Sequence, residues 1–129
     1  MKRRNFAGNS PWEPLAGYSR AVRAGPHVWV SGTTATDADG SLVGPGNAAI
    51  QAGQALANIR RALEAAGARL EDVVRTRLYV TRIEDAEAVA RVHAEFFGDI
   101  RPAATLVEVG RLVDPVMLVE IEADAFVAD

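Results

Sequence analysis

The sequence contains no cysteine, which excludes disulfide bonds, thiolate metal sites and a cysteine nucleophile. Aromatic residues make up only 6% and the net charge is −3, whereas proteins that bind nucleic acid usually present a basic face with stacking aromatic side chains. No run approaches the ~20 apolar residues of a membrane-spanning helix, and no apolar segment follows the basic first five residues, as it would in a secretory signal. We therefore expect a soluble, cytoplasmic protein with neither nucleic acid nor a membrane as its partner.

Signatures of cofactor and metal binding are also missing. Gly44 and Gly46 precede a predicted helix, but the lysine and the spacing of a phosphate-binding loop are absent. His27 and His93 are too far apart in the sequence to form a metal-binding pattern. What is present, 129 residues with 49% hydrophobic and 24% charged side chains, is typical of one globular domain. We expect no cofactor and no metal.

The C-terminal region carries the clearest strand pattern. Between Val116 and Val127 every odd-numbered position is apolar: Met117, Val119, Ile121, Ala123, Ala125 and Val127. The even-numbered positions include three carboxylates, Glu120, Glu122 and Asp124. Because successive side chains of a strand point to opposite faces, one face is predicted to be buried, while the carboxylate face meets solvent or lines a site.

Two helices are predicted from apolar residues at spacings of three and four. The first covers 47–66, with Asn47 as its N-cap and Gly67 just beyond its C-terminus. The second runs from about 83 to 97, ends at Gly98, and carries His93 near its apolar stripe. A lone histidine in that position is usually a packing residue, although a catalytic role stays open.

The strands and helices follow one another in the order ββαβαββ, which predicts an α+β fold with a mixed sheet and both helices on one face. The early strands are 18–24 and 27–31, joined at Gly25 and Pro26, and a later strand covers 73–80 with Val74 on its helix face. The opposite sheet face mixes charged and apolar residues, which suggests burial against another subunit. Residues 1–16 are predicted to be an irregular arm, in which Trp12 docks onto the domain or closes over a cleft, and residues 17–129 form the single domain.

Several stretches resemble one known family. They are Gly17-Tyr18-Ser19, Val30-Ser31-Gly32, the helix residues 51–59, Tyr79-Val80-Thr81, and above all 105–112 followed by 119–123. Together they cover nearly the whole chain and resemble the RidA/YjgF family of small enamine and imine deaminases. The resemblance implies a chorismate-mutase-like fold, a homotrimer whose sheets form a central barrel, and small-molecule clefts between subunits.

The resemblance also implies site residues. Glu120 corresponds to the glutamate that positions and activates water, Tyr18 to a substrate-holding tyrosine, and Ser31 and Gly32 to a backbone contact. The arginine that grips the substrate carboxylate falls on Ala104, just before Thr105, so this chain resembles a divergent branch. Arg101, Arg20 or Arg111 could replace that arginine. His93 stands where the deaminating members usually have a tyrosine.

Three functions follow as expectations. The first is a hydrolase that deaminates a small enamine or imine, with Glu120 as the water-handling group and Tyr18 orienting the substrate. The second is a trimer that binds or senses a ligand, or hydrolyses a different small molecule. The third is a ribonuclease or translation inhibitor, which the acidic composition and scarce aromatic residues favour least. Glu122 and Asp124 are expected to be structural or exposed to solvent.

Overall fold

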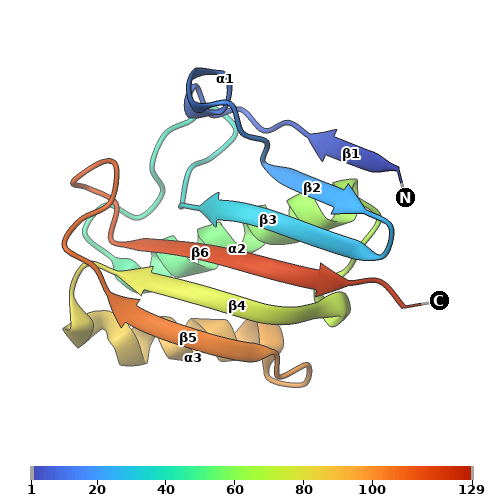
Figure 1. Cartoon of the computed structure of the whole chain (residues 1–129). Helices are drawn as coiled ribbons and strands as arrows, with labels where there is room; N and C mark the ends of the chain where they lie inside the picture. Colours follow the sequence, from blue (N-terminus) through green and yellow to red (C-terminus); the bar gives the residue numbers. More distant parts are fainter. Residues whose placement is uncertain (1, 129) are drawn as a thin grey trace.

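The computed structural model describes residues 2–128, and its centre is a six-stranded sheet in the order β1-β2-β3-β6-β4-β5 (Figure 1). Strands β4 and β5 are parallel and all other neighbours are antiparallel. The elements are β1 (Arg3–Phe6), α1 (Trp12–Ala16), β2 (Ala21–Ala24), β3 (His27–Thr33), α2 (Ala48–Ala65), β4 (Val73–Val80), α3 (Ala86–Phe97), β5 (Ala103–Glu108) and β6 (Val119–Phe126), with short 3₁₀ turns at Leu70–Asp72 and Ile83–Asp85. The predicted ββαβαββ order is confirmed from β2 to β6.

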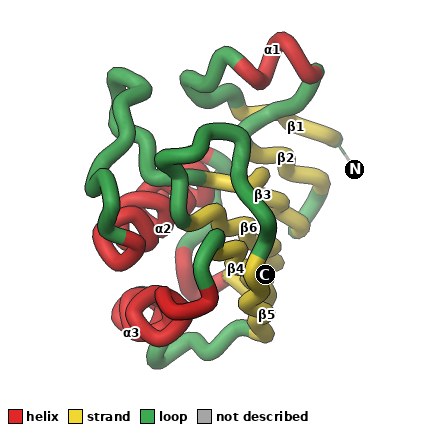
Figure 2. Tube along the Cα trace, turned by 90° about the vertical axis from the view of Figure 1, so that its left-hand side faces the viewer, coloured by secondary structure: helices red, strands yellow, loops and turns green. Residues whose placement is uncertain are grey.

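Helices α2 and α3 cover one face of the sheet and leave the other face open (Figure 2). The alternation predicted for β6 is confirmed, because the odd-numbered residues from Val119 to Ala125 are buried in the core and the even-numbered ones are only half-buried. The α2 stripe that includes Leu56, Ile59 and Leu63 packs into the same core. The carboxylates of β6 therefore lie on the open face.

Helix α2 begins and ends as its sequence predicts. The Oδ1 atom of Asn47 accepts a hydrogen bond from the backbone N–H of Ile50 at 3.0 Å, as an N-cap does. Gly67 follows the helix with a φ of +80°, the left-handed conformation that glycine adopts without strain. Within residues 2–128, no helix is both long and apolar enough to cross a membrane.

One prediction about β4 is wrong. Val74 was assigned to the helix face, but the register of β4 against β6 shifts between Val73 and Arg75. This β-bulge adds one residue to β4, so that Val73 is buried and Val74 is 53% exposed. Simple alternation resumes at Thr76, which is buried.

The N-terminal arm is more regular than predicted. Strand β1 pairs with β2 in antiparallel register and forms one edge of the sheet, and α1 follows as a single helical turn. Strand β1 has only 4 residues, and none of them is fully buried. Its sequence, Arg-Arg-Asn-Phe, has no alternation of apolar and polar residues from which a strand could be predicted. Pairing with β2 holds these residues in a strand conformation that their own sequence does not predict.

Candidate functional site

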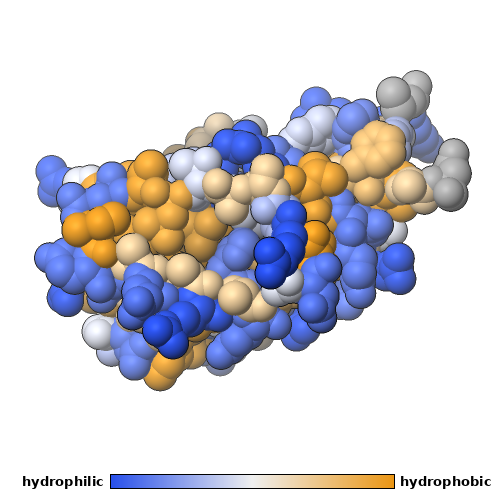
Figure 3. All heavy atoms as spheres, turned by 90° about the horizontal axis from the view of Figure 1, so that it is seen from below, coloured by the Kyte–Doolittle hydropathy of each residue, from blue (hydrophilic) through white to orange (hydrophobic). Residues whose placement is uncertain are grey.

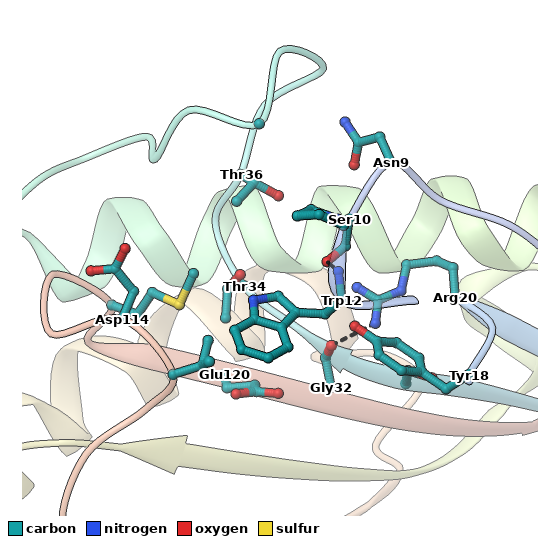
Figure 4. Close-up of a pocket in the computed structure, with 15 residues that line it drawn as sticks. Asn9, Ser10, Trp12, Tyr18, Arg20, Gly32, Thr34, Thr36, Asp114 and Glu120 are labelled. Atoms are coloured by element: carbon teal, nitrogen blue, oxygen red, sulfur yellow. Dashed lines mark hydrogen bonds between the residues drawn. The ribbon is translucent and has the colours of Figure 1, made fainter. Parts of the chain in front are cut away.

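A cavity of about 630 Å³ opens where the arm meets the sheet (Figure 4). It is lined from five segments of the chain: the arm, the residues before β2, the strand β3 and the loop after it, the loop before β6, and β6 itself. The side chains that matter most for its chemistry are those of Trp12, Tyr18, Arg20, Asp114 and Glu120.

Glu120, at the second position of β6, reaches this cavity beside the backbone of β3. A Cβ atom on Gly32 would lie 2.0 Å from the Oε2 atom of Glu120, so any other residue at position 32 would displace the carboxylate. This close approach accounts for the glycine near the end of β3, where the register against β6 shifts. Glycine lets the carboxylate lie directly against the neighbouring strand.

The three carboxylates of β6 differ in their partners. The carboxylate of Glu122 accepts a hydrogen bond from the hydroxyl of Tyr79. That of Asp124 forms an ion pair with Arg77 at 3.2 Å. Within the described part of the chain Glu120 accepts no hydrogen bond from protein, so it is the carboxylate left free for a ligand or for water.

Burial raises the pKa of Glu120 above its ordinary value, because the ionised form loses solvation. The positive charge of Arg20 opposes this effect, and the negative charge of Glu122 adds to it. The net direction is upward. A carboxylate whose pKa is raised toward neutrality is a better proton acceptor than an ordinary one, which is a common property of catalytic bases.

The side chain of Arg20 lies in the cavity wall beside Tyr18. Its Nη2 atom donates a hydrogen bond to the carbonyl oxygen of Gly32 at 2.8 Å, and its guanidinium carbon lies 5.8 Å from the centre of the Tyr18 ring. The Nε atom of Arg20 is buried and has no hydrogen-bond partner. Both residues lie just before β2, so the backbone conformation that leads into this strand sets the positions of their side chains.

The arm is held in place by a buried carboxylate. Glu13 accepts hydrogen bonds from the backbone N–H groups of Gly8 and Ser10, at 2.8 and 3.3 Å. These bonds fold residues 8–13 into a tight loop, and the exposed indole of Trp12 then projects into the cavity from the arm (Figure 4). Glu13 thus helps to anchor the arm, and Trp12 is one of the side chains that line the cavity.

A second hollow, of about 330 Å³, lies on the open sheet face and shares Glu120 and Gly32 with the first. Tyr79, Glu122 and Arg111 contribute to it. The hydrogen bond from Tyr79 to Glu122, together with burial, raises the pKa of the Tyr79 hydroxyl. Glu120 therefore stands between two solvent-accessible spaces.

Four of the predicted site residues come together in the main cavity: Tyr18, Ser31, Gly32 and Glu120. Two of them already have internal partners, because the Ser31 hydroxyl donates to the carbonyl of Ser19 at 2.7 Å and the Gly32 carbonyl accepts from Arg20. What these residues offer to a ligand is therefore the carboxylate of Glu120 and the exposed ring of Tyr18.

The remaining predicted residues lie elsewhere in the chain. Thr105 is on the edge strand β5, where its hydroxyl accepts a hydrogen bond from Arg75 at 3.1 Å. Arg101 is exposed in the turn before β5, with a φ of +56°. His93 lies on the helix side of the sheet, 2.9 Å from the hydroxyl of Thr76, and burial lowers its pKa, so its surroundings are those of a packing residue. Ala104 is also on β5, away from the cavity.

Sequence reasoning missed several polar residues of the cavity, namely Asn9, Ser10, Thr34, Thr36 and Asp114. All of them lie in irregular segments, where no periodicity marks one side chain as facing inward. Arg20 was considered as a replacement for the missing arginine, and the structure places it in this cavity.

The sequence model described as Endoribonuclease L-PSP matches residues 8–127 of this chain. A RutC family protein of Pyrococcus horikoshii is 38% identical, over 98% of each chain. The 3-aminoacrylate deaminase RutC of Acinetobacter baylyi is 39% identical, over 88% of this chain and 90% of its own.

Solved structures give the same result. A Mycobacterium tuberculosis member of the YjgF/YER057c/UK114 family is 49% identical and superposes with a TM-score of 0.90, over 98% of this chain and 100% of the other. A Yersinia pestis protein of the Rid family is 30% identical with a TM-score of 0.86, over 98% and 100%. The chain belongs to the RidA/YjgF family and has its chorismate-mutase-like fold.

Proposed function

We propose that this protein hydrolyses a small enamine or imine to release ammonia, with Glu120 handling the attacking water. The observation that carries this proposal is the position of the Glu120 carboxylate. It lies in a cavity against Gly32, its pKa is raised by burial, and none of the described residues donates a hydrogen bond to it. The 39% identity to a protein named 3-aminoacrylate deaminase supports this choice of substrate, because 3-aminoacrylate is an enamine.

The proposed reaction needs only groups that the cavity holds. An enamine that has taken a proton at carbon is an iminium ion, whose C=N carbon is open to attack. Glu120 accepts a proton from water as the water oxygen bonds to that carbon. That proton then passes from Glu120 to the nitrogen of the carbinolamine. As the C–N bond breaks, ammonia leaves with the bonding electron pair, and the hydroxyl proton of the carbinolamine returns to Glu120, which leaves a carbonyl compound. Tyr18 holds the substrate beside Glu120.

We also propose that the protein works as a cytoplasmic homotrimer with the ligand cleft between subunits. The open sheet face and its edge expose large apolar side chains, including Trp29, Val107 and Phe126. Figure 3, which views the side where β5 and α3 lie, shows apolar residues at the surface among charged ones. A neighbouring subunit that covered this region could bring the β5 segment with Arg101 and Thr105 to the cleft.

A second candidate function is ligand binding or sensing without deamination, or hydrolysis of another small molecule. The observation that favours it is Ala104, which stands where the resemblance implies the carboxylate-binding arginine. A ribonuclease activity, as the name of the matching family model suggests, is supported least. The net charge of −3 and the aromatic content of 6% are unlike the basic, aromatic-bearing faces that usually bind RNA.

Ammonia release from freshly generated 2-aminoacrylate, 2-aminocrotonate and 3-aminoacrylate tests the proposal. Wild-type protein should accelerate release from at least one of them. Glu120→Gln should lower that rate by a factor of about 10²–10⁴, the usual contribution of a general base. The matched control is Glu64→Gln, an exposed carboxylate on α2, which should keep the wild-type rate.

Each failure has a distinct meaning in this experiment. Near-wild-type activity of Glu120→Gln would remove Glu120 from the mechanism while leaving deamination in place. No acceleration by wild-type protein on any of the three compounds would refute deamination of this substrate class and favour the binding or sensing function.

A further inference from the structure

The cavity contains a cation that nothing in the described structure neutralises by direct contact. Arg20 is the one basic side chain among the described residues that line it. No ion pair involving Arg20 occurs within residues 2–128. Of its three nitrogens, Nη2 is bonded to the Gly32 carbonyl and Nε is buried without a partner, whereas Nη1 has no hydrogen-bond partner in the same range.

Two contacts position the guanidinium. The bond to the Gly32 carbonyl fixes one end, and the Tyr18 ring lies beside the group at a distance typical of a cation–π contact. The aliphatic part of Arg20 passes so close to Gly8 that a Cβ atom there would lie 3.2 Å from the Arg20 Cβ. A fixed guanidinium with a free Nη1 suits an anionic oxygen, because little entropy is lost when the hydrogen bond forms.

The size and lining of the cavity indicate the rest of the ligand. Its volume of about 630 Å³ falls within the ~300–1,000 Å³ typical of sites for drug-sized molecules, far more than a three-carbon compound needs. Trp12 and Tyr18 both enter it from the arm side and are both roughly half exposed (Figure 4). Two accessible aromatic rings in one cavity favour a flat partner that can stack on them.

We propose that Arg20 binds the anionic group of the substrate and that Trp12, with Tyr18, holds a flat conjugated or aromatic part. The preferred substrates are then planar anionic imines or enamines larger than 3-aminoacrylate. For the reaction this inference rests on the proposed function, but the binding it describes can be measured without turnover. Glu120, which shares the cavity, would then face the C=N carbon while Arg20 holds the anion.

Three inert probes separate the two parts of the proposal in calorimetric titrations. trans-Cinnamate is planar, conjugated and anionic, trans-cinnamamide is its neutral counterpart, and crotonate keeps the carboxylate without the ring. Wild-type protein should bind cinnamate about tenfold or more tightly than cinnamamide, as expected for a charge-assisted hydrogen bond. It should bind crotonate about three- to tenfold more weakly than cinnamate, the range for an aromatic contact.

Substitutions at Arg20 test the anion site. Arg20→Gln should remove the preference for cinnamate over cinnamamide, and Arg20→Lys should restore part of it, because lysine keeps the charge but not the planar fork. The matched control, Arg91→Gln, removes the same charge from the exposed face of α3 and should leave the preference unchanged. If Arg20 only supports Gly32, Arg20→Gln will weaken both ligands equally, and that result would overturn the anion site.

Substitutions at Trp12 test the stacking surface. Trp12→Ala should weaken cinnamate binding about three- to tenfold without affecting crotonate, whereas Trp12→Phe should keep most of the affinity. An equal loss for both ligands, or a wild-type protein that does not prefer cinnamate to crotonate, would overturn this part. Retained binding without ammonia release would refute the proposed deamination alone, and ammonia release without these preferences would refute the substrate class alone.

Discussion

At the scale of single residues, what distinguishes Glu120 is the absence of a protein partner. Glu122 and Asp124 stand on the same strand face, yet Tyr79 and Arg77 engage them. Glu120 lies instead against Gly32, where no side chain competes for the space. Such an arrangement costs stability, because a partly buried carboxylate without hydrogen-bond donors is poorly solvated when it ionises.

This cost gives Glu120→Gln a pH-dependent effect on stability. Since burial raises the pKa of Glu120 in the folded protein, the folded state binds this proton more tightly than the unfolded state does. The free energy of unfolding of the wild type therefore loses a contribution as pH rises through and above the ordinary glutamate value. Glutamine carries no charge, so the melting temperature of the variant relative to wild type should increase from about pH 4 to about pH 8.

Thermal melts across that pH range, with Glu64→Gln as the exposed control, measure this difference. A melting-temperature difference for Glu120→Gln that stays constant, or that falls as pH rises, would contradict a raised pKa for Glu120.

At the scale of elements, the site depends on how short segments are fixed to the sheet. Glu13 helps the arm to position Trp12, because its carboxylate closes residues 8–13 into a loop. Tyr18 and Arg20 then lead directly into β2. The bulge in β4 likewise shows that local pairing decides where a side chain points. A single inserted residue there puts Val74 on the open face.

Glu13→Ala should loosen the arm without unfolding the domain. Its carboxylate accepts two backbone N–H groups in a part-buried place, so its loss should lower the free energy of unfolding by about 1–3 kcal/mol. Amide hydrogen exchange should accelerate in residues 8–18 and stay unchanged in α2. Glu84→Ala, an exposed carboxylate before α3, serves as the control. Unchanged exchange in the arm would show that Glu13 is not its anchor.

At the scale of the whole molecule, the open sheet face carries exposed apolar side chains among its charged ones. Trp29 and Phe126 are each 45% exposed there. The Trp29 ring stacks on His27, and the Phe126 ring contacts His27 edge-on. Large apolar side chains gathered on one face of a small protein usually mark an interface. This face is where the proposed trimer contact would lie.

Sedimentation should therefore show one species of about 41 kDa, three times the 13.7 kDa of a single chain. Phe126→Asp should shift the protein toward monomer, because it places a charge in the proposed contact. Leu15→Asp, at an exposed position of α1, is the control and should remain trimeric. A wild-type protein that sediments as a monomer would refute the trimer and the inter-subunit cleft with it.

The sequence by itself determined the elements whose residues repeat with a clear period. The alternation of β6, the apolar stripe and caps of α2, and the ββαβαββ order all follow from local patterns that the core then buries. Glu120 and Tyr18 were also predicted as site residues from the sequence, through the motifs of the family, and both line the cavity.

Only the tertiary structure decided which of the three carboxylates on β6 is free, and which arginine lines the same cavity. Those facts depend on partners 12 to 47 residues away, such as Gly32 for Arg20 and Asp124 for Arg77. The arm, the bulge and the polar loops of the cavity are likewise invisible to periodicity, since pairing and side-chain contacts between distant segments fix their positions. The sequence specified the scaffold, and the contacts between distant segments made the site.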